Sequence, residues 1–124
     1  MSTPAALLID GAPDVLAAMT RIIRRAGFVV TACSSAGEGL GRIEIGERFA
    51  LVVSDMRMPE MDGSQFRLRA LAAWPDLDTV LAFVTGEPEQ DWRGKIGAAR
   101  LFTKPVGRAF RAFASECRCR ASQA

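Results

Sequence analysis

Four residues with chemically useful side chains stand far apart in the sequence, each at the end of a short apolar segment: Asp10, Asp55, Thr85 and Lys104. A carboxylate acts as a nucleophile toward a phosphoryl group, and it is also an oxygen ligand that magnesium accepts. Each residue also has an ordinary structural explanation, such as a turn, a helix cap or a surface charge. The chemistry therefore depends on whether the fold brings the four together.

The elements that would position these residues alternate between strand and helix. Apolar runs predict strands at 5–9, 28–32, 49–53, 79–84 and 100–103. Helical spacing and end signals predict helices at 13–26, 63–74 and 106–117, with a short helix at best within 88–97. A further helix should open at the capping box Ser35-x-x-Glu38, weakened by the three glycines that follow.

Five strands that read as buried on both faces, alternating with five helices, predict an α/β fold with a parallel sheet covered by helices on each side. No linker, repeat or low-complexity stretch divides the chain, so we expect one domain over 1–124, with a core at about 5–117 and a short C-terminal tail. In such sheets the ligand crevice lies outside the carboxyl ends of the strands. All four chemically useful residues are expected at that edge.

The amino-acid composition argues against several classes of protein. The 124 residues carry a formal net charge of +2, three cysteines and no histidine. An odd number of cysteines and no histidine argue for a reducing compartment, the cytoplasm, and against a Cys/His zinc site. No apolar run reaches the roughly 18 residues of a membrane span. The basic C-terminal segment favours a solvated helix face over a nucleic-acid patch, because no aromatic stacking pattern accompanies it; its residues are Arg108, Arg111, Arg118 and Arg120.

The segment Ser54-Asp55-Met56-Arg57-Met58-Pro59-Glu60-Met61-Asp62-Gly63 resembles the acceptor motif of response-regulator receiver domains, D-x-x-M-P-x-M-D-G. The spacing of Asp10, Asp55, Thr85 and Lys104-Pro105 also matches that family, over essentially the whole chain. The resemblance implies a flavodoxin-like, doubly wound sheet with strand order 2-1-3-4-5. It also implies a signalling phosphoacceptor of two-component systems rather than an enzyme.

The resemblance implies a role for each site residue. Asp55 is the expected phosphoacceptor, and a magnesium ion is expected on Asp10, Asp55 and the backbone carbonyl of Arg57. Lys104 resembles the lysine that pairs with the acceptor carboxylate and then with phosphoryl oxygens. Thr85 resembles the hydroxyl that moves toward the phosphoryl group.

The resemblance also implies a cis Lys104-Pro105 bond, which proline makes inexpensive. Because the chain has no histidine, the phosphodonor must be another molecule, by resemblance a histidine kinase or a histidine phosphotransfer protein. The downstream effector is not identified by the sequence.

Three features depart from the family pattern. Gly11 stands where the family has a second acidic residue, and Arg57 adds a cation two residues after the acceptor, so we expect weak magnesium binding. Leu101 replaces the family's aromatic switch residue, with Phe102 as its neighbour. The distance from Thr85 to Lys104 is short, which predicts a truncated fourth helix.

Two functional classes remain compatible with the sequence. One is a working phosphoacceptor, which the joint presence of Asp55, Thr85 and Lys104 favours. The other is a pseudo-receiver, a protein-interaction module that acts without phosphorylation. A haloacid-dehalogenase-type phosphatase is rejected, because Asp10-Gly11-Ala12 does not supply its Asp-x-Asp motif.

Overall fold

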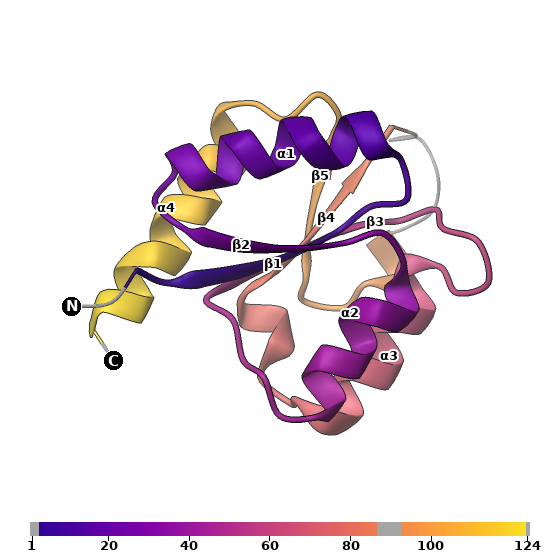
Figure 1. Cartoon of the computed structure of the whole chain (residues 1–124). Coiled ribbons are helices and arrows are strands. Elements are labelled where there is room, and N and C mark those ends of the chain that lie inside the picture. Colours follow the sequence, from indigo (N-terminus) through magenta and orange to yellow (C-terminus); the bar gives the residue numbers. More distant parts are fainter. Residues whose placement is uncertain (1–2, 87–92, 124) are drawn as a thin grey trace.

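The computed structural model describes residues 3–86 and 93–123 and contains one five-stranded parallel sheet. Its order, β2-β1-β3-β4-β5, confirms the predicted flavodoxin-like topology (Figure 1). The strands are β1 Ala5–Ile9, β2 Val29–Cys33, β3 Leu51–Asp55, β4 Leu81–Thr85 and β5 Arg100–Thr103. Two of them, β1 and β5, have the predicted bounds, whereas β2 to β4 lie one or two residues further along the chain.

Helices cover both faces of the sheet, with α1 and α4 on one side and α2 and α3 on the other (Figure 1). Their bounds are α1 Pro13–Arg25, α2 Ala36–Glu44, α3 Gly63–Ala73 and α4 Arg108–Gln123. Two 3-10 helices, η1 Leu77–Thr79 and η2 Arg93–Lys95, complete the order.

The segment expected to hold a short helix at best, 88–97, contains the 3-10 helix η2 within its described residues, which agrees with the predicted truncation of the fourth helix; residues 88–92 lie outside the described residues. Two other expectations about these elements are wrong. The last helix runs to Gln123 rather than ending near Cys117, since no glycine or proline follows Cys117 to stop it. The edge strands β2 and β5 are partly exposed, because each has a neighbour on one side only.

The core consists of two layers, one on each face of the sheet. Alternate residues of a strand point to opposite faces. Leu7 and Ile9 of β1 accordingly pack under α2 and α3, and Ala6 and Leu8 pack under α1 and α4. The central strands β1, β3 and β4 are buried on both faces, which matches their nearly continuous apolar sequence.

Helix α2 begins where the sequence predicts, because the Ser35 side chain accepts a hydrogen bond of 3.2 Å from the backbone N–H of Glu38. One of its three glycines has a packing role that the sequence did not reveal. A Cβ at Gly39 would collide with the side chain of Ile9. Glycine at this position therefore lets α2 lie close against β1.

Candidate functional site

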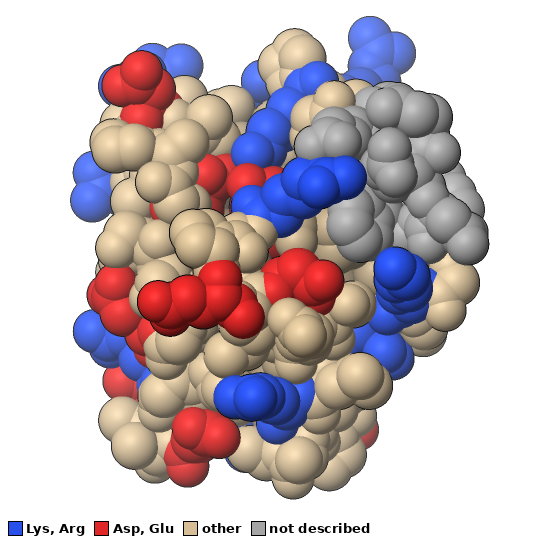
Figure 2. Space-filling view, turned by 90° about the vertical axis from the view of Figure 1, so that its right-hand side faces the viewer, with Lys and Arg blue, Asp and Glu red and all other residues tan. Residues whose placement is uncertain are grey.

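The four predicted site residues meet at the carboxyl edge of the sheet. Asp55 ends β3 and Thr85 ends β4, and Asp10 and Lys104 directly follow β1 and β5. The backbone N–H of Lys104 donates to the carbonyl of Thr85 at 2.8 Å, which joins the ends of β4 and β5. Figure 2 views the molecule from this side and shows acidic and basic side chains next to one another.

Lys104 bridges the two carboxylates. Its Nζ donates to Oδ2 of Asp10 at 2.9 Å and lies 3.3 Å from Oδ2 of Asp55. Asp10 is 3 % exposed, so its charge depends on this partner and on the backbone N–H of Ala12, which donates to Oδ1 at 2.9 Å. The arrangement holds two carboxylates together with one cation between them.

Burial and the contacts between Lys104 and the two carboxylates shift the pKa values of Asp55 and Lys104. Burial raises the pKa of Asp55, and the charge of Asp10 adds to the increase, although Lys104 and the N–H of Met56 act against it. Burial works against the charged form of Lys104. Its hydrogen bond to Asp10 and the charges of both carboxylates nevertheless hold the pKa of Lys104 above its ordinary value.

Thr85 is 2 % exposed at the end of β4, in register with Thr103 of β5. The Lys104-Pro105 peptide bond is cis. Thr85 and Lys104 therefore lie at the carboxyl edge of the sheet, where the sequence predicts them. The expected movement of Thr85 toward a phosphoryl group stays a prediction.

The loop between β3 and α3 is fixed by buried contacts. The N–H of Met56 donates to Oδ1 of Asp55 at 2.8 Å, and the Met56 side chain is fully buried. The N–H of Gly63 donates to the carbonyl of Met56 at 2.8 Å. A Cβ on Gly63 would stand only 2.8 Å from Met56 Sδ and from Phe83 Cε1, so glycine is required here by close packing.

Sequence reasoning missed the cap that begins α3. The Asp62 side chain accepts from the backbone N–H of Gln65 at 2.9 Å, and the Gln65 side chain accepts from the N–H of Asp62 at 3.0 Å. This is a reciprocal capping box. The Asp-x-x-Gln spacing in the sequence was a sufficient signal, but the acceptor motif had already explained Asp62.

A pocket opens beside Asp55, and both unusual residues line it: Gly11 from the end of β1 and Arg57 from the loop after β3. Both are exposed. The backbone of Gly11 is not left-handed, and an added Cβ would meet only the carbonyl of Ser34, at an ordinary distance of 3.6 Å. The backbone therefore accepts a larger residue at position 11, so glycine is not required here by conformation or by packing.

The two neighbouring carboxylates, Asp10 and Asp55, fit a magnesium ion. Asp10 and Asp55 provide carboxylate oxygens, and magnesium is commonly held by one or two carboxylates with water in its other positions. No group of three or more His, Cys, Asp or Glu side chains suited to a metal occurs within residues 3–86 and 93–123. Gly11 lines the pocket beside Asp55 and contributes no carboxylate to it.

Leu101 and Phe102 of β5 face opposite sides of the sheet. Leu101 is partly buried against the layer under α2 and α3. Phe102 packs on the α4 side, with its ring centroid 5.5 Å from that of Phe110 and 6.0 Å from that of Phe113. The aromatic residue of β5 is thus held in the core and does not replace a ring at position 101.

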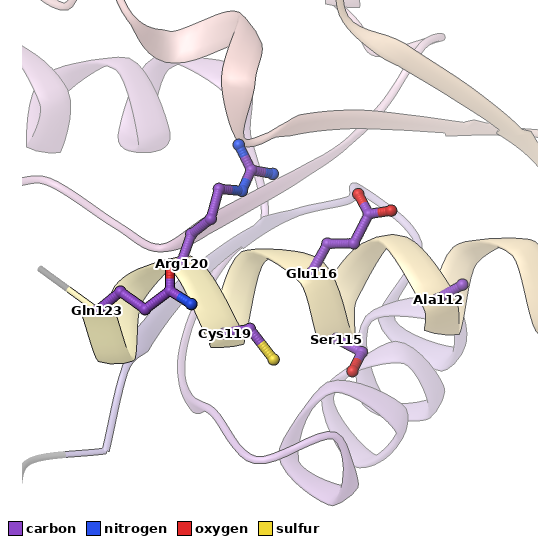
Figure 3. A pocket seen from close by; sticks show the side chains of 6 residues that line it. All are labelled: Ala112, Ser115, Glu116, Cys119, Arg120 and Gln123. Atoms are coloured by element: carbon purple, nitrogen blue, oxygen red, sulfur yellow. The ribbon is translucent and has the colours of Figure 1, made fainter.

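A second hollow lies along the exposed side of α4, away from the four site residues (Figure 3). Figure 3 shows Glu116 and Arg120 extending from the same side of the helix.

The three cysteines form no disulfide: Cys33, Cys117 and Cys119 are all free thiols. Within the described part of the chain, no helix is long and apolar enough to cross a membrane.

Comparison with known sequences identifies the family. The model of the response regulator receiver domain matches residues 6–110. The C4-dicarboxylate transport transcriptional regulatory protein DctD of Rhizobium meliloti is 39 % identical over 85 residues, covering 68 % of this chain and 18 % of that protein. The transcriptional regulatory protein GlrR of Escherichia coli is 32 % identical over 101 residues, covering 81 % and 22 % respectively. The chain thus spans about a fifth of the length of these curated relatives.

Solved structures share the fold. A receiver domain protein (CheY-like) from Methanospirillum hungatei superposes with a TM-score of 0.81 at 24 % identity, covering 99 % of this chain and 100 % of that one. The receiver domain of the sensor histidine kinase PA1611 from Pseudomonas aeruginosa, with magnesium in its active-site cleft, gives 0.81 at 19 % identity, covering 95 % and 99 %. With the family match, these likenesses lead to one conclusion: the chain belongs to the response regulator receiver domains, the signalling domains of two-component systems.

Proposed function

We propose that the chain is a working phosphoacceptor that receives a phosphoryl group on Asp55 from a histidine kinase or a histidine phosphotransfer protein. The observation that carries the proposal is the bridge at the sheet edge, in which Lys104 contacts both Asp10 and Asp55. The bridge supports the proposal because a cation beside Asp55 can neutralise the oxygens of a phosphoryl group on that carboxylate. We further propose that residues 1–124 act as one domain in the cytoplasm.

The residues divide the work of phosphoryl transfer between them. A carboxylate oxygen of Asp55 attacks phosphorus while the bond from phosphorus to the donor atom breaks, and the donor leaves with its bonding electron pair. Lys104 then neutralises the phosphoryl oxygens, and the hydroxyl of Thr85 donates to one of them. The N–H of Met56 holds Oδ1 of Asp55, which orients the nucleophile.

Asp10, Asp55 and the backbone carbonyl of Arg57 are the groups that would hold magnesium in this site. When bound, the ion neutralises negative charge on the transferred group. The buried Asp10 is fixed by Lys104 and by the N–H of Ala12, so it is preorganised to receive either the ion or a water molecule of its shell.

The second candidate is a phosphorylation-independent interaction module. Gly11 favours it, because the pocket beside Asp55 lacks one carboxylate. The two functions differ in one covalent event, so a labelling experiment separates them.

The test is to incubate the protein with magnesium and a small phosphodonor and to measure its intact mass. Working chemistry adds the mass of one phosphoryl group to wild type and to the exposed-site control Asp76→Asn, but none to Asp55→Asn. Equal labelling of Asp55→Asn and wild type would reject the assignment of Asp55. The absence of labelling at every magnesium concentration would support the interaction module instead.

A further inference from the structure

Helices α1 and α4 hold the excess positive charge of the protein. They lie on the same face of the sheet (Figure 1). Together they carry seven arginines and two acidic residues, Asp14 and Glu116, which gives the pair a net charge of +5. The whole chain has a net charge of +2, so the residues outside these two helices together carry −3. The positive charge is therefore concentrated in one layer of the molecule.

Two arginines of α1 lie on the side of that helix that faces α4. Ala18 of α1 lines a hollow together with Val106, which stands just before α4. Residues three, four and seven positions apart share one side of a helix, so Arg21 and Arg25 lie on the same side of α1 as Ala18. Both arginines are exposed.

Two arginines of α4 lie on the side of that helix that faces α1. A Cβ added to Gly27, just after α1, would collide with the side chain of Arg118, so Arg118 covers the end of α1. Arg111 is seven residues earlier on the same side of α4, about 10 Å along the helix axis. Both are exposed. Glu116 and Arg120 point away from α1, into a hollow beside the start of β5.

The four arginines that flank the boundary between α1 and α4 form the arginine seam: Arg21, Arg25, Arg111 and Arg118. Among residues 3–86 and 93–123, no carboxylate forms an ion pair with any of them. Like charges held close together repel each other, and carboxylates supplied by another molecule would relieve that repulsion. The guanidinium fork also matches the two oxygens of a carboxylate.

Two other anionic partners fit the arginine seam less well. A membrane surface calls for apolar side chains beside the basic ones. The exposed large hydrophobic residues of the described chain are Val29, Ile45 and Leu68, which belong to β2, to the end of α2 and to α3. A nucleic-acid duplex presents a long row of phosphates, whereas the seam is short and the rest of the chain carries net negative charge.

We propose that the arginine seam is a docking surface for a short acidic segment of a partner protein, whose Asp and Glu side chains pair with the four guanidinium groups. The uneven charge of the molecule steers such a segment toward α1 and α4. Both helices end on the side of the molecule away from the carboxyl edge that holds Asp55 (Figure 1). The inference therefore does not depend on phosphoryl transfer.

The test measures binding of a fluorescently labelled oligoglutamate peptide to the whole chain by fluorescence anisotropy, at low and at physiological salt. The variant Arg25→Gln/Arg111→Gln removes two charges of the arginine seam. The matched control, Arg24→Gln/Arg120→Gln, removes the same charge from the same two helices outside the seam. A labelled DNA duplex and vesicles of phosphatidylcholine with phosphatidylserine are titrated in the same way.

Wild type should bind oligoglutamate, and the affinity should fall as salt is added. Arg25→Gln/Arg111→Gln should weaken binding at least about tenfold, the effect of losing two exposed ion pairs, and the control should weaken it less than about threefold. Both double variants should melt close to the wild-type temperature, because all four replaced side chains are exposed.

Two results would overturn the docking surface: no binding of oligoglutamate by wild type, or an equal loss of affinity in the two double variants. Tighter binding of the duplex or of the vesicles than of oligoglutamate, lost in Arg25→Gln/Arg111→Gln, would overturn the acidic protein segment as the occupant. None of these results bears on the labelling of Asp55, so the proposed function is tested separately.

Discussion

The Nζ of Lys104 donates a 2.9 Å hydrogen bond to Oδ2 of Asp10, a carboxylate that lies 94 residues earlier in the chain and is almost completely buried. Leaving a buried charge without its partner is more costly than never forming the pair. The bond therefore ties the stability of the fold to the same two residues that shape the site.

Replacing Lys104 by methionine keeps the apolar stem but leaves Asp10 and Asp55 without their shared cation. We expect the free energy of unfolding to fall by about 1–3 kcal/mol, measured by urea denaturation. In an Asp10→Asn background the same replacement should cost at least about 0.5 kcal/mol less, because the charge that Lys104 compensates is gone. Identical losses in the two backgrounds would refute the coupling.

Gly11→Asp should tighten magnesium binding. The backbone of Gly11 is not left-handed and its surroundings leave room for a side chain, so the fold should tolerate aspartate. We expect an affinity gain of at least about tenfold, or ~1.4 kcal/mol, by magnesium titration, with little change in thermal stability. Unchanged affinity and an unchanged melting temperature would show that the missing carboxylate does not limit metal binding.

Gly63→Ala tests the packing of the acceptor loop. The new methyl group would press on Met56 and Phe83, both fully buried, so we expect a loss of about 1–3 kcal/mol in thermal or urea unfolding. Gly41→Ala is the matched control, since nothing lies within 4 Å of its added Cβ in α2. The control should gain up to about 1 kcal/mol from helix propensity. A loss in both variants would point to glycine effects unrelated to close packing.

Asp62 gives a pH-dependent prediction. Burial acts to raise the pKa of Asp62, but hydrogen bonds from Gln65 and Ser64 outweigh it and hold that pKa below its ordinary value. Its contribution is therefore present above the unfolded pKa, about 3.9, and is lost as the pH falls through the folded pKa. Asp62→Ala should cost about 1 kcal/mol at pH 7 and progressively less below pH 3.9.

Asp76→Ala is the control for this cap, because Asp76 precedes η1 without a side-chain cap hydrogen bond. It should change stability by less than about 0.5 kcal/mol. A pH-independent difference between wild type and Asp62→Ala would contradict the role of the ionised carboxylate.

The sequence was sufficient for the sheet and for the edge that holds the site. Short apolar runs located all five strands, and the carboxyl-edge rule for parallel sheets brought together Asp10, Asp55 and Thr85. The family resemblance also implied that Lys104 pairs with Asp55, and the two side chains are 3.3 Å apart. The sequence did not predict the hydrogen bond from Lys104 to Asp10 or the packing of Gly39 on Ile9, because both depend on side-chain positions that only the folded chain defines.

Helix ends were less predictable, for a related reason. Cys117 is the last buried residue of α4, but the helix continues through mostly exposed and mostly polar residues to Gln123, where no apolar pattern marks its end. The described residues of the segment before β5 hold only the 3-10 helix η2. The short spacing between Thr85 and Lys104 predicts that a helix here is truncated, but it does not predict where the helix begins or ends.

The most direct measurement locates the phosphoryl group within the chain. The protein is labelled with a small phosphodonor and reduced with borohydride, which converts an aspartyl phosphate to homoserine, and its peptides are then mapped by mass spectrometry. A working phosphoacceptor gives homoserine at position 55 and leaves Asp10 and Asp62 unchanged. Homoserine at another aspartate, or none in a preparation whose intact mass shows labelling, would contradict Asp55 as the acceptor.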